Sequence, residues 1–185
     1  MKTFIGALVG GLLIFIWQFL SWTMLQSHDK AMEYTPKQDS ILNYLSSQFS
    51  GDGSYIMPRS APGTSMKECQ EQMKDKIGKP WAQVTYHTAM KDNMGSAMGR
   101  NLLVNIIAVW LLCWILSGIT VNSFGKTFMA SLFTGLIIFL QGPYVMHIWY
   151  ATFDIGAHLV DYVVSWGLVG LWLGWLLNRK KSVTA

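Results

Sequence analysis

The sequence has few charged residues, few cysteines and none of the common catalytic motifs. Of its 185 residues, 13% are charged and two are cysteines, whereas 51% are hydrophobic. The hydrophobic excess excludes a disordered chain, and the low charge excludes a nucleic-acid-binding protein that relies on a basic tail. Cys69 and Cys113 are predicted outside and inside a membrane respectively, so they do not form a disulfide framework.

The sequence also lacks the motifs that mark enzymes and cofactor sites. It contains no glycine-rich phosphate loop after a strand, no HExxH or CxxC motif and no serine in a nucleophile elbow. Its apolar stretches form no obvious inverted repeat of the kind seen in many secondary transporters. We therefore predict no catalytic residue and no cofactor, and no motif assigns a metal ion.

Long apolar runs are abundant instead. Four of them are apolar enough to be interpreted as membrane spans: Phe4–Leu25, Asn101–Leu116, Phe124–Leu140 and Leu159–Leu177. The first follows Lys2 and has no small-residue cleavage site, which predicts an uncleaved anchor helix. The second and third are joined by the short stretch 117–123, which predicts a helical hairpin. The predicted fold class is an α-helical integral membrane protein with four transmembrane helices.

The distribution of charge predicts the topology. The net charge is +4, but residues 25–100 are nearly balanced, with nine basic and eight acidic residues. The remaining basic residues are Lys2, Lys126, Arg179, Lys180 and Lys181. With the amino terminus inside, all of them lie on the cytoplasmic side, as the positive-inside rule favours. Both termini are then cytoplasmic, and the segment 26–99 is extracytoplasmic.

This segment is predicted to form a small α+β insertion between the first and second transmembrane helices. Thr35 and Gln38 fit a capping box that begins one helix, and Ser65 and Glu68 fit a second. The runs 55–57 and 81–87 have the residue types of strands and are expected to pair. Such a small unit has a limited core, so we expect it to lean on the membrane helices or a partner.

Other residues are assigned to the membrane interface and to helix contacts. The segment 144–155 is predicted to lie in the interface, because Gly142 and Pro143 end the third span. Interfacial anchors are expected at Trp17, Trp22, Trp172 and Trp175. The two small-residue pairs predicted to lie at helix contacts are Gly6 with Gly10 and Gly95 with Gly99.

The strongest candidate for chemistry is the set Asp154, His158 and Asp161, spaced for one face of a helix near the outer end of the fourth span. Such groups form a polar cap of the helix bundle, a cation site or proton path, or a partner contact. A bend at Gly156 is expected to separate Asp154 from the other two. His28, followed by Asp29, is a single polar pair that by itself specifies nothing.

A second candidate set is His87, Met90, Met94 and Met98. Thioether and imidazole donors outside the cytoplasm suit copper. Methionines at helical spacing also fill gaps in packing, which is the commoner reason for such a pattern.

A set of residues in the stretch 10–45 and in the segments 50–58 and 61–63 forms a recognisable pattern, and the last helix fits it more loosely. The matching residues are Gly10, Gly11, Trp17, Ser21, Trp22, His28, Asp29, Gly53, Tyr55 and Pro58. In this pattern the sequence resembles a family of small bacterial inner-membrane proteins without an assigned activity. Gln26 and Ser27 depart from the Pro-Trp pair expected there. The resemblance implies four helices in a bacterial inner membrane and no catalytic residues.

Together these observations favour a non-catalytic accessory or assembly subunit of a larger inner-membrane complex. Its expected partners are membrane lipid and other inner-membrane subunits, not nucleic acid. The first alternative is a small transporter or metal- or proton-handling protein that uses the Asp/His cluster. The second is a lipid-binding protein that uses the interfacial segment 144–155.

Overall fold

The computed structural model describes residues 1–118 and 123–179 and divides the chain into two compact units. One consists of Met1–Glu33 and the chain from Asn93 onward, and the other of Tyr34–Asp92. The first unit holds α1 (Lys2–Phe19), α4 (Met94–Ser117), α5 (Phe124–Phe139), α6 (Val145–Trp149) and α7 (Ile155–Asn178). The second holds α2 (Gln38–Gln48), β1 (Gly53–Met57), α3 (Met66–Lys74) and β2 (Ala82–Tyr86).

The first unit contains four helices long and apolar enough to cross a membrane, in agreement with the prediction. They run over Lys2–Met24, Met94–Ser117, Phe124–Trp149 and Ile155–Asn178. Each is longer than about 30 Å of hydrocarbon requires, at 1.5 Å rise per residue. They are the candidate transmembrane helices of a multi-pass protein.

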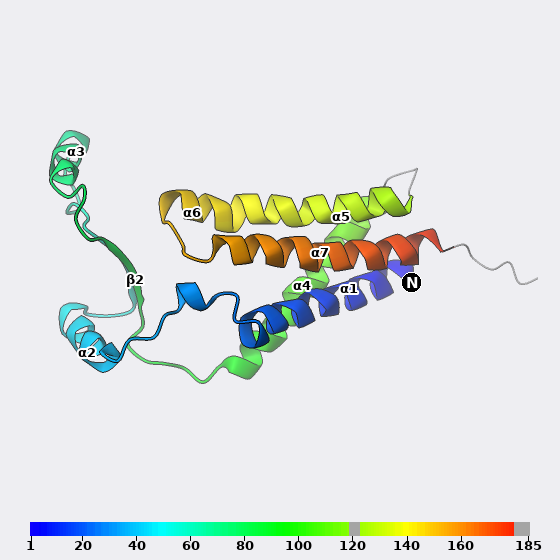
Figure 1. Cartoon of the computed structure of the whole chain (residues 1–185), viewed down its shortest axis with the longest axis horizontal. Helices are drawn as coiled ribbons and strands as arrows, with labels where there is room; N and C mark the ends of the chain where they lie inside the picture. Colours follow the sequence, from blue (N-terminus) through cyan, green and yellow to red (C-terminus); the bar gives the residue numbers. More distant parts are fainter. Residues whose placement is uncertain (119–122, 180–185) are drawn as a thin grey trace, which may run out of the picture. The chain divides into compact units, whose positions relative to one another are not determined.

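These helices pack in the order α4, α1, α7, α5 (Figure 1). The predicted hairpin of the second and third spans is therefore wrong as a packing unit, because α4 packs along α1 and α5 packs along α7. Glycines set this pairing. A Cβ on Gly11 of α1 would lie 2.6 Å from the backbone of Ile106, and one on Gly135 of α5 would lie 2.7 Å from Trp166.

The two predicted glycine pairs differ in their surroundings. A Cβ on Gly6 would lie 2.9 Å from Leu173, and one on Gly10 would lie 2.7 Å from Val109, so both glycines lie at helix contacts. Gly95 and Gly99 are exposed, with open space where a Cβ would stand. They bring no helices together among the described residues, because α1 packs on another side of α4.

The third helix continues past its predicted end. Leu140–Tyr144 forms a π-helical turn that includes Pro143, and α6 follows it without a break. A π-helical turn changes the local hydrogen-bond pattern and so accommodates a proline, which has no N–H to donate. The helix therefore covers residues 144–149 of the segment 144–155, whose place at the membrane interface stays a prediction.

The fourth helix begins earlier than predicted. It starts at Ile155 with Asp154 as its N-cap residue and runs unbroken to Asn178. The expected bend at Gly156 is absent from this helix, because nothing within 4 Å crowds that residue and the helical hydrogen bonds continue through it. Asp154, His158 and Asp161 therefore belong to the first two turns of one helix.

Both ends of the described bundle carry specific contacts. At one end, the Lys2 ammonium donates to the Arg179 carbonyl at 3.1 Å, and the Trp172 indole donates to the Gly6 carbonyl at 3.2 Å. The Arg179 guanidinium lies 5.2 Å from the ring centroid of Trp175. We call the opposite end, where α1 finishes and α7 begins, the His28 end.

The second unit confirms the predicted strand pair. β1 and β2 are antiparallel, with Gly53 opposite Tyr86 and Met57 opposite Ala82. The predicted capping box of α3 is also present, because Ser65 and Glu68 bond each other's backbone N–H groups. The predicted N-cap Thr35 was wrong by two residues, since Lys37 is the N-cap of α2 and Thr35 Oγ1 instead accepts from the Lys37 N–H at 3.3 Å.

One exposed carboxylate joins the residue before β1 to the two residues after β2. Asp52 accepts hydrogen bonds from the N–H and the hydroxyl of Thr88 at 2.8 and 2.7 Å, and the His87 ring lies 3.5 Å away. These hydrogen bonds, those from Thr88 first, lower the pKa of Asp52 to about 2.

The methionine series does not form a single helical stripe. α4 begins at Met94, so only Met94 and Met98 of the set lie on a helix. Met90 is fully exposed in the chain before it, and His87 faces Asp52. His87 and Met90 therefore do not share a helical face with Met94 and Met98, and the predicted copper site was based on such a face.

The glycine contacts predict which small-residue positions hold the bundle together. Gly11→Ala places a methyl group against the backbone of Ile106, which cannot move aside as a side-chain end would. We expect it to destabilise the bundle by about 1–3 kcal/mol, the usual cost of overpacking. Thermal unfolding in detergent measures the effect. Gly99→Ala is the matched control and should leave the melting temperature unchanged or raise it. Equal losses for the two variants would contradict the packing described.

Candidate functional site

A reversal of the chain after α1 brings His28 back onto the bundle. The helix ends in a π-helical turn, Leu20–Met24, and Gln26 follows with φ of 50°, in the left-handed region. The Ser27 N–H then donates to the Ser21 carbonyl at 3.1 Å, which closes the turn. A left-handed conformation is unfavourable for glutamine, and such strain persists where the surrounding structure holds it in place. The turn therefore fixes the position of the residue that follows.

His28 is buried between two carboxylates of the fourth helical segment. Its side chain is only 1% exposed. Nδ1 lies 2.7 Å from Asp154 Oδ2, and Nε2 lies 3.0 Å from Asp161 Oδ2. The two aspartates are seven residues apart, so they stand on one face of α7 two turns from each other. A single imidazole ring thus links the end of α1 to the start of α7.

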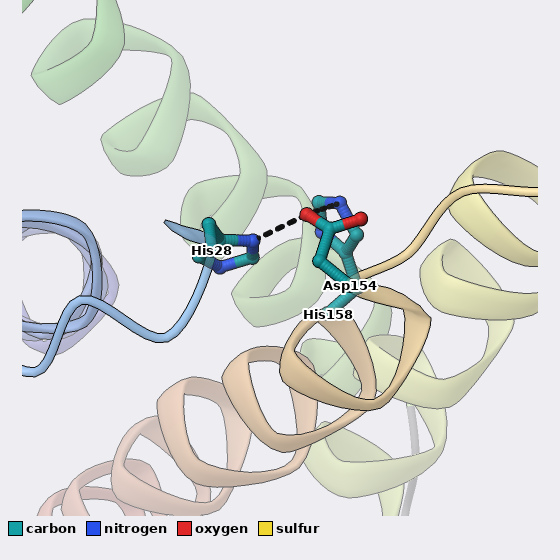
Figure 2. A group of neighbouring side chains, drawn as sticks. All are labelled: His28, Asp154 and His158. Atoms are coloured by element: carbon teal, nitrogen blue, oxygen red, sulfur yellow. Dashed lines mark hydrogen bonds and ion pairs between the residues drawn. The ribbon is translucent and has the colours of Figure 1, made fainter. Parts of the chain in front are cut away.

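His158 and Trp22 complete the surroundings of His28. His158 Nε2 lies 3.3 Å from the same Asp154 oxygen that faces His28, and the two imidazole rings meet edge to face at 4.7 Å. Figure 2 shows His28 approaching from the coil after α1, while Asp154 and His158 stand on the first turn of α7. The Trp22 ring stacks on His28 at 4.0 Å with an interplanar angle of 7°.

The second oxygen of Asp161 is also used. The Trp17 indole N–H donates to Asp161 Oδ1 at 3.0 Å. Trp17 and Trp22, which were predicted as interfacial anchors, both contact this cluster. We refer to His28, Asp154, His158 and Asp161 as the His28 centre.

The hydrogen bonds imply that His28 carries two protons. Carboxylates accept, so each ring nitrogen that faces one donates, and a histidine with two donating nitrogens is an imidazolium. Burial lowers the pKa of His28, but the hydrogen bonds to Asp154 and Asp161 outweigh it and raise the pKa above its ordinary 6.5. Burial likewise raises the pKa of Asp154, but its bond to His28 and the His158 charge lower that pKa below the ordinary 3.8.

The predicted cluster is therefore assembled, with different partners. Asp154, His158 and Asp161 come together, but the pair expected to be most secure, His158 with Asp161, is replaced by His158 with Asp154. The central residue was missed, because His28 lies 126 residues from Asp154. The predicted topology held a signal for it, since the end of the first span and the start of the fourth fall on the same side of the membrane.

The centre offers three types of chemistry. The imidazole of His28 exchanges a proton, the carboxylates bind cations, and donor atoms of His28, Asp154 and His158 all lie within 4.8 Å of one another. A cavity of about 570 Å³ lies beside the same chain segments, lined by Lys30, Ala31, Glu33 and Phe153. Water and ions therefore have an open space next to the residues that flank His28 and Asp154.

Comparison with models of protein families, with curated proteins and with solved structures finds no match for this chain. The protein is therefore characterised by its own structure: four helices of transmembrane length and a buried histidine–aspartate centre at one end of the bundle.

Removing the His28 imidazole tests how much it contributes to the stability of the fold. His28→Ala leaves Asp154 buried and without its main partner, a defect that costs about 3–5 kcal/mol when one member of a buried ion pair is removed. We expect a melting temperature in detergent that is lower by several degrees. His87→Ala is the matched control, because His87 pairs with an aspartate but is exposed. A His28 variant as stable as the His87 variant would show that the centre contributes no stability.

The pH dependence of stability follows from the two shifted groups. Because the pKa of His28 is raised, its full contribution to the stability of the folded protein is present below pH 6.5. This contribution is lost as the pH rises through the raised pKa. Because the pKa of Asp154 is lowered, its full contribution to the stability of the folded protein is present above pH 3.8. This contribution is lost as the pH falls through the lowered pKa. The wild-type protein should therefore exceed a His28→Gln variant in melting temperature by more at pH 5.5 than at pH 9. An equal advantage at both pH values would contradict this linkage.

Proposed function

We propose that the protein is a small cation-handling membrane protein that binds and moves a proton or a metal ion at the His28 centre. One observation carries this proposal: His28 is 1% exposed, and both of its ring nitrogens face carboxylates. Ionisable groups in a membrane bundle are costly to bury, and they commonly mark proton relays and ion sites. A purely structural link between α1 and α7 needs only one hydrogen-bonded pair, whereas four ionisable side chains meet here.

Charge at the far end of the bundle supports an orientation. Lys2 and Arg179 lie together there, and Lys126 belongs to the first turn of α5. If this end is cytoplasmic, as the positive-inside rule favours, the His28 centre faces the extracytoplasmic side. Both termini are then cytoplasmic, as the sequence predicts. The resemblance to small bacterial proteins favours the inner membrane as the location.

Buried hydroxyl groups extend from the centre between α5 and α7, which supports transport over static binding. The Ser165 hydroxyl donates to the Asp161 carbonyl at 2.6 Å, and the Ser131 hydroxyl donates to the Trp166 carbonyl at 2.8 Å. One turn before Ser131, the Thr127 hydroxyl is buried without a hydrogen-bond partner among the described residues. We take these buried hydroxyl groups as the candidate path for a proton between the helices and the ionisable groups of the centre as its entrance.

Flux measurements in proteoliposomes test the proposal. Vesicles that hold a pH-sensitive dye report proton entry under an imposed gradient, and vesicles that hold a zinc indicator report Zn²⁺ entry. We expect the wild-type protein to move one of these cations faster than empty vesicles do. Asp154→Asn should reduce the rate to the empty-vesicle level, because it removes the carboxylate shared by both histidines.

The control for charge loss is Asp52→Asn, which removes an exposed carboxylate in the Tyr34–Asp92 unit and should leave the flux unchanged. A wild-type protein that moves neither cation faster than empty vesicles would contradict the proposal. So would an Asp154→Asn variant that transports at the wild-type rate.

A second candidate function is the accessory or assembly subunit that the sequence favours. The Tyr34–Asp92 unit supports it, because among its residues only Tyr86 is buried. Large side chains are exposed in it, among them Ile77 at 81%, Tyr34 at 78% and Trp81 at 54%. A unit with so little core and so much exposed apolar surface is typical of a docking module.

Cross-linking in native membranes followed by mass spectrometry tests this candidate. Photoreactive groups at positions 77 and 81 should capture one partner subunit in stoichiometric amount, and a group at the exposed position 99 of α4 serves as the control. A lone monomer that purifies without any co-purifying subunit would contradict the accessory role.

A further inference from the structure

Three donor atoms of the His28 centre are spaced for a single metal ion. His28 Nδ1 lies 2.7 Å from Asp154 Oδ2, and His158 Nε2 lies 3.3 Å from that same oxygen. Ligands at 2.0–2.1 Å from a tetrahedral zinc ion are separated from one another by about 3.4 Å. The pair involving His158 already has about this spacing, the pair involving His28 reaches it by opening by about 0.7 Å, and the donor atoms of all three residues lie within 4.8 Å of one another.

We propose that the His28 centre is a binding site for a divalent transition-metal ion, with His28 Nδ1, Asp154 and His158 Nε2 as its ligands. This inference rests on the proposed cation-handling function and names its cation. Two imidazoles and one carboxylate form a ligand set typical of zinc and related ions, and three protein ligands leave a coordination position for water or a transported group.

Asp161 is the positioning residue of this site. It bonds His28 at Nε2, the nitrogen that does not face Asp154, and its other oxygen accepts from the Trp17 indole. In metal sites a histidine ligand commonly donates its second N–H to a carboxylate, which fixes the ring and its tautomer. Asp161 therefore keeps the proton on Nε2 and leaves Nδ1 for the ion. A helix contact alone gives no reason for this second, oriented carboxylate.

The charges of the site balance when the ion is bound. With His158 neutral, two carboxylates and a protonated His28 sum to one negative charge, which is unfavourable in a buried position. The ion takes the place of the proton on Nδ1, and that proton leaves to solvent. Two positive charges then meet two negative ones, with His28 and His158 neutral as ligands must be.

The centre is exposed on one side. His158 is 27% exposed, whereas the Asp154 side chain is 4% exposed, so His158 forms the open side of the centre. The cavity lies beside the residues that follow His28 and the residue that precedes Asp154. Its lining includes Lys30, Phe153 and Glu33, and Glu33 adds a carboxylate at its wall. Trp22 covers the His28 ring by stacking.

The donor types select among cations. Mg²⁺ and Ca²⁺ prefer oxygen ligands, and six to eight of them in the case of Ca²⁺, whereas imidazole suits Zn²⁺, Ni²⁺, Cu²⁺ and Fe²⁺. We therefore expect Zn²⁺ to bind the full chain in detergent and to resist competition by excess Mg²⁺.

Calorimetric titration of chelator-treated protein with Zn²⁺, together with X-ray absorption of the Zn²⁺ complex, tests the site. We expect one ion per chain with two imidazole ligands. His158→Ala, which leaves both His28–aspartate bonds in place, should weaken affinity by about 100-fold or more, and Asp161→Asn by about 10–100-fold. The absorption spectrum should lose one imidazole in His158→Ala, whereas Asp161→Asn should keep both. His87→Ala is the control for exposed histidines and should bind as the wild type does.

The outcomes separate this inference from the proposed function. Absence of Zn²⁺ binding, or binding that His158→Ala leaves unchanged, overturns the metal site. If the same protein then carries protons in vesicles in a manner that depends on Asp154, cation handling stands with the proton as its cation. Absence of both Zn²⁺ binding and flux overturns both proposals. Equal loss of imidazole signal in Asp161→Asn and His158→Ala contradicts the positioning role of Asp161.

Discussion

The structure depends on one buried ring, the His28 imidazole held between Asp154 and Asp161. These contacts join chain positions 126 and 133 residues apart, and they tie the end of α1 to the first turns of α7. Each charge in such a cluster is costly to bury alone, and the cluster persists because every member has a partner. The reversal after α1, with its left-handed Gln26, and the early start of α7 both serve to bring these groups together.

Below this centre the bundle is held by packing of another kind. Glycines let α1 approach α4 and let α5 approach α7, and the contacts are between apolar side chains and backbone. In a membrane such close packing replaces the hydrophobic effect as the main attraction between helices. Packing therefore fixes the helices along the bundle, and the polar end holds the groups to which we assign cation handling. A substitution in the centre should affect both stability and the proposed function, because the same hydrogen bonds orient the site and join the helices.

The sequence predicted the elements of this protein better than their partners. The four long helices, the strand pair of the second unit and the Ser65 capping box follow from local patterns, and all are present. The pairing of α4 with α1 was missed, since chain proximity favoured α5, whereas the close fit of Val109 and Ile106 against Gly10 and Gly11 favours α1. The π-helical turn at Pro143 was missed because proline normally ends a helix. His28 was missed because no local pattern distinguishes a histidine that folds back onto a distant helix, although the predicted topology placed its partners on the same side.

The protonation of His28 in the metal-free protein is the most direct test of this account. Nitrogen NMR of ¹⁵N-histidine-labelled protein in detergent, treated with chelator and assigned with His28→Gln, reports both ring nitrogens of His28 as the pH is changed. The account predicts that both nitrogens stay protonated through the ordinary histidine pKa of 6.5 and that the ring loses a proton only above it. A His28 ring that titrates at or below pH 6.5, or that is already neutral there, would contradict the two hydrogen bonds that His28 donates to Asp154 and Asp161.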